Sequence, residues 1–96
     1  MQRITDKDLE AVARRINLAM GTPDLPWAPR DGGGMRANIG NFHLSHAYGG
    51  VALHQMQTEG GGVSDIFGCH MPKRELYDRM HAFLRGVEAG RATEEV

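Results

Sequence analysis

Hydrophobic side chains follow a helical spacing at both ends of this chain and an alternating spacing in its middle. Residues 5–20 and 72–89 carry apolar side chains every three or four positions, as amphipathic helices do. Residues 35–57 alternate apolar and polar side chains, as half-buried strands do. The order helix, strands, helix predicts an α+β fold of two layers, in which both helices cover one face of a small antiparallel β-hairpin sheet of two or three strands.

Local signals mark the ends of both predicted helices. Thr5 can cap the first helix, and Asp8 stands where the acid of a capping box belongs. Gly21 can close its last turn in the left-handed conformation. Pro72 suits the first turn of the second helix, and Gly90 is expected to stop it.

The chain is expected to form one domain, because 96 residues can build only one small core. Thirteen glycines, about twice the usual share of roughly 7%, are expected at the joints between its elements. The expected segments are a helix, a connector rich in proline and glycine, a β-hairpin region, a glycine-rich loop, a helix and a frayed tail, at residues 5–20, 21–34, 35–57, 58–71, 72–89 and 90–96.

A glycine pair predicts the turn of the hairpin in two alternative registers. One register places Gly49 and Gly50 in the turn, and the other places Tyr48 and Gly49 there and pairs His43 with His54. Both registers give the outer face of the hairpin the same side chains: His43, Ser45, Ala52, His54 and Met56.

Two details of the strand region stay open. The alternation changes phase at Gly40-Asn41, which requires either a bulge or a turn. Residues 63–67 lie in the glycine-rich loop and can add a short edge strand.

The stretch from Ala37 to Thr58 contains no Asp, Glu, Lys or Arg. Protein interfaces are depleted of charge and enriched in Tyr and Met, although a half-buried sheet would give the same composition. A sheet edge without lysine is also open to pairing with another strand. The outer face and the turn are therefore the predicted site for a protein partner, or for a second copy that pairs at the sheet edge, with the contact residues His43, Ser45, Tyr48, His54 and Met56.

Charge and cysteine content exclude several classes of function. A net charge of −1 argues against a strongly basic nucleic-acid binder and against a polybasic membrane anchor. A single cysteine cannot form an internal disulfide, which suits a reducing compartment. The charged start does not resemble a signal peptide, and no apolar run approaches the roughly 18 residues of a membrane span. A cytoplasmic location is therefore expected.

The five histidines and the cysteine predict neither a metal site nor a catalytic site. His43 and His46 face opposite sides of a strand, which leaves His43 and His54 as the one close pair, and two ligands do not make a zinc site. Cys69 and His70 are adjacent, and adjacent side chains rarely align for proton transfer. The glycine runs lack the lysine of phosphate-binding loops. The chain is therefore expected to be non-enzymatic and to use no cofactor.

The segments ANIGNFHL, AYGGV, GGVSD and KRELYD, which begin at residues 37, 47, 61 and 73, resemble small proteins encoded by tailed phages and prophages. The resemblance covers most of the chain, and these proteins have no assigned activity. It implies a phage setting and an accessory role. Phage accessory proteins of this size resemble stoichiometric binders that act on host machinery, including inhibitors of host defence. A protein-binding module for a host or phage partner is therefore the first prediction of function.

A second resemblance is to double-stranded-RNA-binding domains. These domains share the order helix, strands, helix and place basic residues at the start of the last helix, where Lys73 and Arg74 stand here. The resemblance implies nucleic-acid binding by Arg36, Lys73, Arg74 and Arg79 as the alternative function. It ranks second because the chain is slightly acidic and its hairpin is uncharged.

Overall fold

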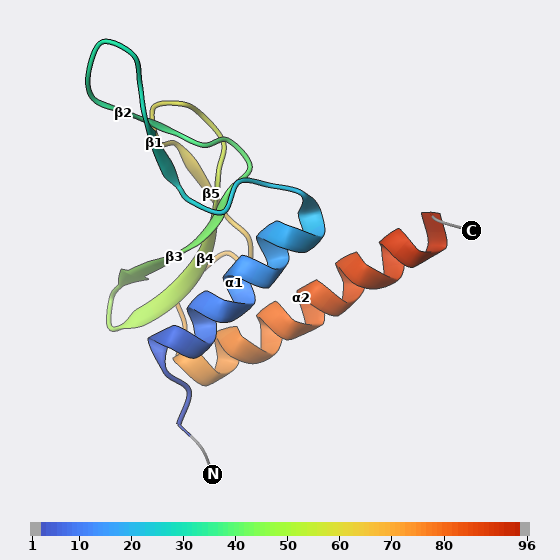
Figure 1. Ribbon diagram of the computed structural model, residues 1–96. Coiled ribbons are helices and arrows are strands. Elements are labelled where there is room, and N and C mark those ends of the chain that lie inside the picture. Colours follow the sequence, from blue (N-terminus) through green and yellow to red (C-terminus); the bar gives the residue numbers. More distant parts are fainter. Residues whose placement is uncertain (1–2, 95–96) are drawn as a thin grey trace.

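The computed structural model describes residues 3–94 and contains two helices and two antiparallel sheets (Figure 1). The elements are α1 (Asp6–Met20), β1 (Trp27–Pro29), β2 (Met35–Ala37), β3 (Phe42–Ala47), β4 (Gly50–Met56), β5 (Val63–Asp65) and α2 (Lys73–Glu94). One sheet pairs β1 with β2, and the other has the order β3-β4-β5. The predicted α+β fold with the order helix, strands, helix is confirmed.

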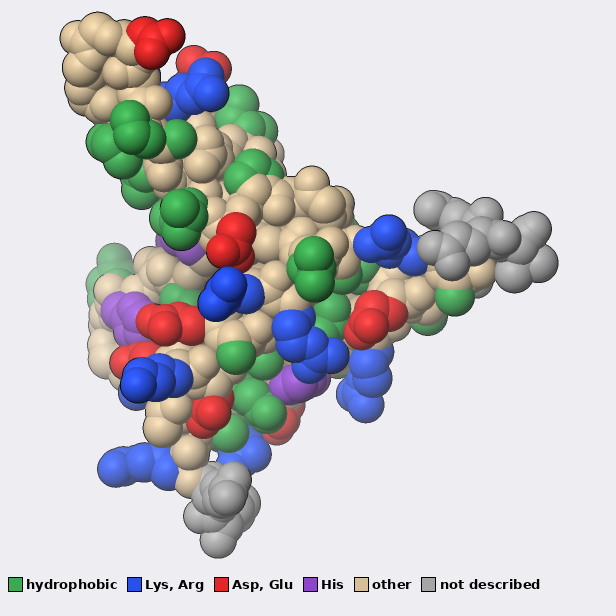
Figure 2. Space-filling model, in the orientation of Figure 1, with side chains coloured by type: hydrophobic (Ala, Val, Ile, Leu, Met, Phe, Trp, Pro, Cys, Tyr) green, Lys and Arg blue, Asp and Glu red, His purple; other side chains and the backbone are tan. Residues whose placement is uncertain are grey.

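Both helices pack on one face of the three-stranded sheet, where they form the hydrophobic core. Leu9 and Ile16 of α1, Leu53 of β4, and Leu76 and Met80 of α2 are all 0% exposed. Burying one such side chain contributes roughly 1.5–3 kcal/mol. The other side of the helices carries charged side chains of both signs (Figure 2). Many of the charged residues of the chain thus lie on the two helices, whereas residues 37–58 contain no Asp, Glu, Lys or Arg.

The predicted caps of α1 are confirmed. The Thr5 hydroxyl accepts a hydrogen bond from the Asp8 amide at 3.2 Å, and the Thr5 amide donates to Asp8 Oδ2 at 2.8 Å. Gly21 adopts the left-handed conformation with φ 71° and closes the helix. The hydrogen bonds that the Thr5 backbone and side chain make to the Asp8 carboxylate favour its ionised form, and they lower its pKa below the ordinary value.

The end predicted for α2 at Gly90 is wrong, because the helix continues to Glu94. Residues 90–94 are helical rather than frayed, and residues 95–96 of the predicted tail lie outside the described residues. A glycine inside a helix costs only about 1 kcal/mol, so it does not end a helix unless the chain turns there. Arg91 also donates a hydrogen bond to the Ala19 carbonyl at the end of α1, which ties the last turns of α2 to the body. No helix within residues 3–94 is long and apolar enough to cross a membrane.

The β3–β4 hairpin has the second of the two predicted registers. Ala47 pairs with Gly50, and Tyr48 and Gly49 form the turn with φ angles of 56° and 73°. Two positive φ angles are the signature of a turn whose twist matches that of the strands. The register pairs His43 with His54, as one alternative predicted.

The predicted connector at residues 21–34 contains a strand, which the sequence analysis missed. β1 pairs with β2 from Trp27 opposite Ala37 to Pro29 opposite Met35. Three successive glycines in the loop between them have φ angles of 89°, 107° and 79°. We call this β1–β2 hairpin the arm, because it projects from the body in Figure 1.

The Gly40-Asn41 step is a turn, because β2 and β3 belong to different sheets. Gly40 has a φ angle of 95°, which a non-glycine residue rarely adopts. The predicted glycine-rich loop contains β5, whose residues pair with β4 from Asp65 opposite His54 to Val63 opposite Met56. The short edge strand expected within residues 63–67 therefore forms, and it covers one edge of β4.

Candidate functional site

The face of the three-stranded sheet that points away from the helices carries a row of three histidines. The ring centroids of His43 and His54 are 6.0 Å apart, and those of His54 and His70 are 5.8 Å apart. His70 follows β5 and reaches across the sheet, where its Nε2 lies 3.1 Å from Ser45 Oγ on β3. We call His43, Ser45, His54 and His70 the histidine face. His70 belongs to it although the sequence did not place it there.

Two other predicted contact residues differ in their exposure. Tyr48 is 96% exposed at the hairpin turn, and its ring centroid lies 5.6 Å from that of His70. Met56 is 3% exposed on β4, where it pairs with Val63 and its carbonyl accepts a hydrogen bond from the Gly40 amide at 2.8 Å. Its side chain therefore offers no surface to a partner, whereas His70 does.

His43 is half-buried beside a second imidazole. Burial lowers its pKa below the ordinary value, and the neighbouring His54 lowers it further, whereas a hydrogen bond with Asn41 acts in the opposite direction. His43 Nδ1 lies 3.1 Å from Asn41 Oδ1, and Asn41 is 0% exposed. On the other side, His54 Nε2 lies 3.8 Å from Asp65 Oδ2. His43 therefore favours its neutral form in the folded chain.

The contact between Ser45 and His70 resembles a nucleophile beside a base. In a catalytic pair of this kind a third group orients the histidine. Within residues 3–94, no hydrogen bond reaches the second ring nitrogen of His70. The same residues contain no group of three or more His, Cys, Asp or Glu side chains arranged to hold a metal ion. The histidine face thus lacks the geometry of a catalytic triad.

The open edge of the sheet is at β3. On the other side of the hairpin, Val51 exchanges two hydrogen bonds of 2.9 Å with Met71, and the Leu53 carbonyl accepts one of 3.0 Å from Ile66. Directly opposite these residues stand His46 and Leu44. In an antiparallel ladder, opposite residues of this kind point their backbone groups away from each other. The amides and carbonyls of His46 and Leu44 therefore point out of the sheet, and no hydrogen bond from residues 3–94 reaches them.

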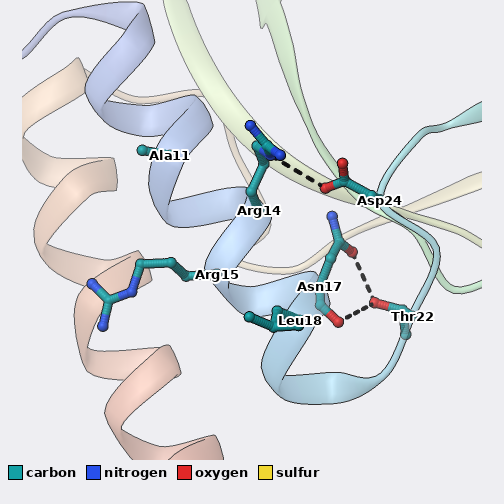
Figure 3. Close-up of a pocket in the computed structure, with 7 residues that line it drawn as sticks. All are labelled: Ala11, Arg14, Arg15, Asn17, Leu18, Thr22 and Asp24. Atoms are coloured by element: carbon teal, nitrogen blue, oxygen red, sulfur yellow. Dashed lines mark hydrogen bonds and ion pairs between the residues drawn. The ribbon is translucent and has the colours of Figure 1, made fainter.

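A buried asparagine of α1 occupies the same edge one pair further along. Asn17 is 2% exposed; its Oδ1 accepts a hydrogen bond from the Phe42 amide at 2.8 Å, and its Nδ2 donates to the Phe42 carbonyl at 3.0 Å. The Thr22 hydroxyl also donates to Asn17 Oδ1 at 2.8 Å (Figure 3). The amide group of Asn17 thus replaces a neighbouring strand at Phe42. Within residues 3–94, it leaves Leu44 and His46 as the open residues of this edge.

A groove of about 620 Å³ runs along this open edge. Its walls come from α1, from the loop after α1 and from β3, including Glu10, Ala13, Arg14, Leu25, Pro26 and Leu44. A second hollow of about 450 Å³ shares Arg14, Asn17 and Asp24 with the groove (Figure 3). Between them, Arg14 Nε lies 3.5 Å from Asp24 Oδ1, and this ion pair ties the loop to α1.

Asp6, His46 and Lys73 form a charge cluster at the end of the groove near the start of α1. Asp6 Oδ1 lies 3.2 Å from His46 Nε2 and 3.3 Å from Lys73 Nζ. The hydrogen bonds from His46 and then Lys73 lower the pKa of Asp6 below its ordinary value, and burial acts against them. The cluster joins the starts of both helices to the far end of β3.

The basic residues of the alternative function are divided between two ends of the molecule. Lys73, Arg74 and Arg79 lie in the first two turns of α2, whereas Arg36 lies in β2 on the arm (Figure 1). Arg79 Nη2 lies 3.3 Å from Glu75 Oε1, and Lys73 is paired with Asp6. Arg36 therefore does not join the other three in one basic patch.

The edge residues Asn17, Leu44 and His46 were not among the predicted site residues. The alternation of β3 signals which side chains share a face but not which backbone groups stay unpaired, since that depends on β5. Asn17 gave one signal, because it is a polar residue on the apolar stripe of α1 between Ile16 and Ala19. Comparison of the chain with protein-family models, with curated proteins and with solved structures found no match.

Proposed function

We propose that this protein is a non-enzymatic binding module that takes up an extended segment of a protein as an additional strand at the β3 edge. The outward amides and carbonyls of Leu44 and His46 support this function most directly. Such alternating donors and acceptors are complementary to the backbone of another strand, and strand addition to a sheet edge is a common mode of peptide recognition.

The groove supports the same function, because it provides room for the side chains of an added strand. Ala13, Leu25, Pro26 and Leu44 give it apolar surface, while Glu10 and Arg14 stand on its helical wall. Backbone hydrogen bonds give such a complex affinity and side-chain pockets give it specificity. The groove therefore favours extended segments that present both apolar and polar side chains on the face that meets Leu44 and Glu10.

The turn and the histidine face extend the proposed surface. Tyr48 follows β3 directly and is almost fully exposed. Tyrosine is enriched at interfaces because it buries a large area and loses little side-chain entropy. The resemblance to small phage proteins adds the proposal that the partner belongs to the phage or to its host.

A proline at the edge tests this proposal. His46→Pro removes the outward amide but no hydrogen bond of the ladder, and prolines are tolerated at such edge positions. His46→Ala is the matched control, because it removes the same imidazole and keeps the amide. Linear peptides selected from a random library on the immobilised wild-type protein should bind His46→Pro at least tenfold more weakly than His46→Ala.

Amide hydrogen exchange of the peptide complex gives the second measurement. The amides of Leu44 and His46 should exchange rapidly in dilute, monomeric protein, where the edge is unoccupied, and become protected when a selected peptide binds. The proposal is overturned if the selected peptides bind both variants equally and leave these two amides unprotected.

A further inference from the structure

The part of β3 that can accept a strand is short and has defined ends. At one end Asn17 already occupies the backbone groups of Phe42. At the other end the chain leaves the strand at Tyr48, which has a φ angle of 56°. Residues 43–47 lie between these limits, and Ser45 is their centre.

This segment is complementary to itself. An antiparallel copy centred on Ser45 places Leu44 opposite His46 of the second copy, and the reverse pair follows from the two-fold symmetry. Both residues point their backbone groups outward, so each pair can exchange two hydrogen bonds, and the contact makes four. If the register is shifted by two residues toward the start of β3, the second copy has to pair with Phe42, whose backbone groups Asn17 already occupies. The centred register uses every open group and avoids Asn17.

The helix beside the edge is compatible with the same symmetry. Asp6 contacts His46 and Asn17 contacts Phe42, so α1 runs antiparallel to β3. A two-fold axis at Ser45 then brings two copies of α1 antiparallel to each other near their first turns. Lys7 and Glu10 are exposed there and make no ion pair within residues 3–94. Since Asp6 lies beside His46 and Asn17 beside Phe42, the level of Ser45 falls between Lys7 and Glu10, which would bring Lys7 of one copy toward Glu10 of the other.

We propose that the strand taken up by the β3 edge is β3 of a second copy of this chain, related by a two-fold axis at Ser45, which joins two three-stranded sheets into one of six strands. The proposal rests on the proposed function, because it identifies the extended segment that the edge accepts. It also covers exposed surface, since the register brings the turn of each copy opposite Phe42 at the end of the groove, where Leu25 is 64% exposed.

A cysteine on the axis tests the register. In the proposed dimer Ser45 stands opposite Ser45 of the second copy in a non-hydrogen-bonded pair. The two Cα atoms of such a pair are about 4.5 Å apart, a separation that suits a disulfide. Cys69 is exposed and is first replaced by serine in every variant. Ser45→Cys in the Cys69→Ser protein should then form a disulfide-linked dimer in air.

His43→Cys in the same background is the matched control, because His43 has similar exposure on the same face but lies opposite Ala47 of the second copy. It should stay largely uncross-linked. Equal cross-linking of both variants would show random collision and overturn the register, and so would cross-linking of neither.

Sedimentation of the wild-type protein measures the dimer itself. Wild type and His46→Ala should sediment as dimers, whereas His46→Pro should dissociate at least tenfold more readily. A wild-type protein that is monomeric at millimolar concentration overturns the second copy as the partner. The proposed function is judged separately, since library peptides that still distinguish His46→Pro from His46→Ala would support it for the monomer.

Discussion

The two hairpins of this chain both reverse at glycines but lie in different surroundings. The β3–β4 hairpin packs beneath both helices, and its Val51 and Leu53, which belong to the core with the helices, are 0% exposed. The arm has one buried side chain, Ala37, while Met35 remains 53% exposed. A turn that contains glycine therefore specifies where the chain reverses. Contact with the helices decides how strongly the resulting strands are held.

The arm is attached to the body by few contacts. The Ala37 amide donates to the Glu59 carbonyl at 2.9 Å, and the Asn38 amide donates to the Pro26 carbonyl at 2.8 Å. The ring of Trp27 lies directly against Gly61. We therefore expect the arm to open locally at a lower free energy than the β3–β4 hairpin, since local stability follows buried apolar contact.

The greatest loss of stability should follow when a side chain buried in the β3–β4 hairpin is shortened. Leu53→Ala should lower the free energy of unfolding by about 2–5 kcal/mol, because it leaves a cavity between the sheet and both helices. Met35→Ala on the arm is the control and should change it by less than about 0.5 kcal/mol. Urea denaturation measures both values. Equal losses would contradict the difference between the two hairpins.

The next effect concerns the edge of β3. Asn17→Ala leaves the amide and carbonyl of Phe42 without partners in a buried position and should cost about 2–3 kcal/mol. Thr22→Val is the control, because it removes a hydroxyl that bonds Asn17 but keeps both bonds to Phe42, and it should cost about 1 kcal/mol or less. The hydrogen-exchange rates of the backbone amides in the arm should not change in either variant. A cost of Asn17→Ala no larger than that of Thr22→Val would show that Asn17 does not hold the edge.

A smaller effect is expected at the contact between Trp27 of the arm and Gly61 of the body. A Cβ at Gly61 would lie 2.8 Å from Cη2 of Trp27, so Gly61→Ala must push the indole away. Gly33→Ala is the control, because its φ angle of 107° is close to the 100° of Gly61 and a Cβ there meets nothing within 4 Å. Both variants bear the left-handed cost of about 1–2 kcal/mol. Only Gly61→Ala should shift the fluorescence of Trp27 to the red, and identical spectra would argue against the contact.

The smallest expected effect is the pH dependence carried by His43. Its pKa is lowered in the folded chain by burial and by His54, so protonation favours the unfolded chain. The stability that this residue contributes is complete above about pH 6.5 and is lost as the pH falls from there through the lowered pKa. Asp6 and Asp8 act in a separate window, below about pH 4, because their pKa values are lowered from 3.8. The melting temperature should therefore decrease less between pH 7 and pH 5 in His43→Gln than in wild type, and parallel curves would exclude the effect.

The sequence predicted those parts of the fold that depend on neighbouring residues. The cap of α1 by Thr5 and Asp8 needs only four consecutive residues, and the pairing of His43 with His54 follows from the turn at Tyr48-Gly49 once the register is chosen. The arm was missed because three prolines favour an extended connector, whereas the strand at residues 27–29 forms only when residues 35–37 return to pair with it.

The site was predicted only in part for the same reason. The outer-face residues His43, Ser45 and His54 could be assigned from alternation alone. His70 joins them because the loop between Ile66 and Met71, which both bond to β4, carries it onto this face, and no local sequence pattern signals the course of that loop. The open groups of Leu44 and His46 depend on which side of the hairpin β5 covers.

Asn17 also has a consequence for the order in which the chain folds. Its two bonds to Phe42 join residues 25 positions apart, and they can form only after α1 has presented the amide on its apolar stripe. A slip of β3 by one residue against the helix would bring the groups of His43 to Asn17 and would turn every side chain of the strand to the wrong face. Helix formation, which is fast and local, can therefore precede the slower strand pairing and select its alignment. Refolding of Asn17→Ala should show the loss of this guide as a slower phase.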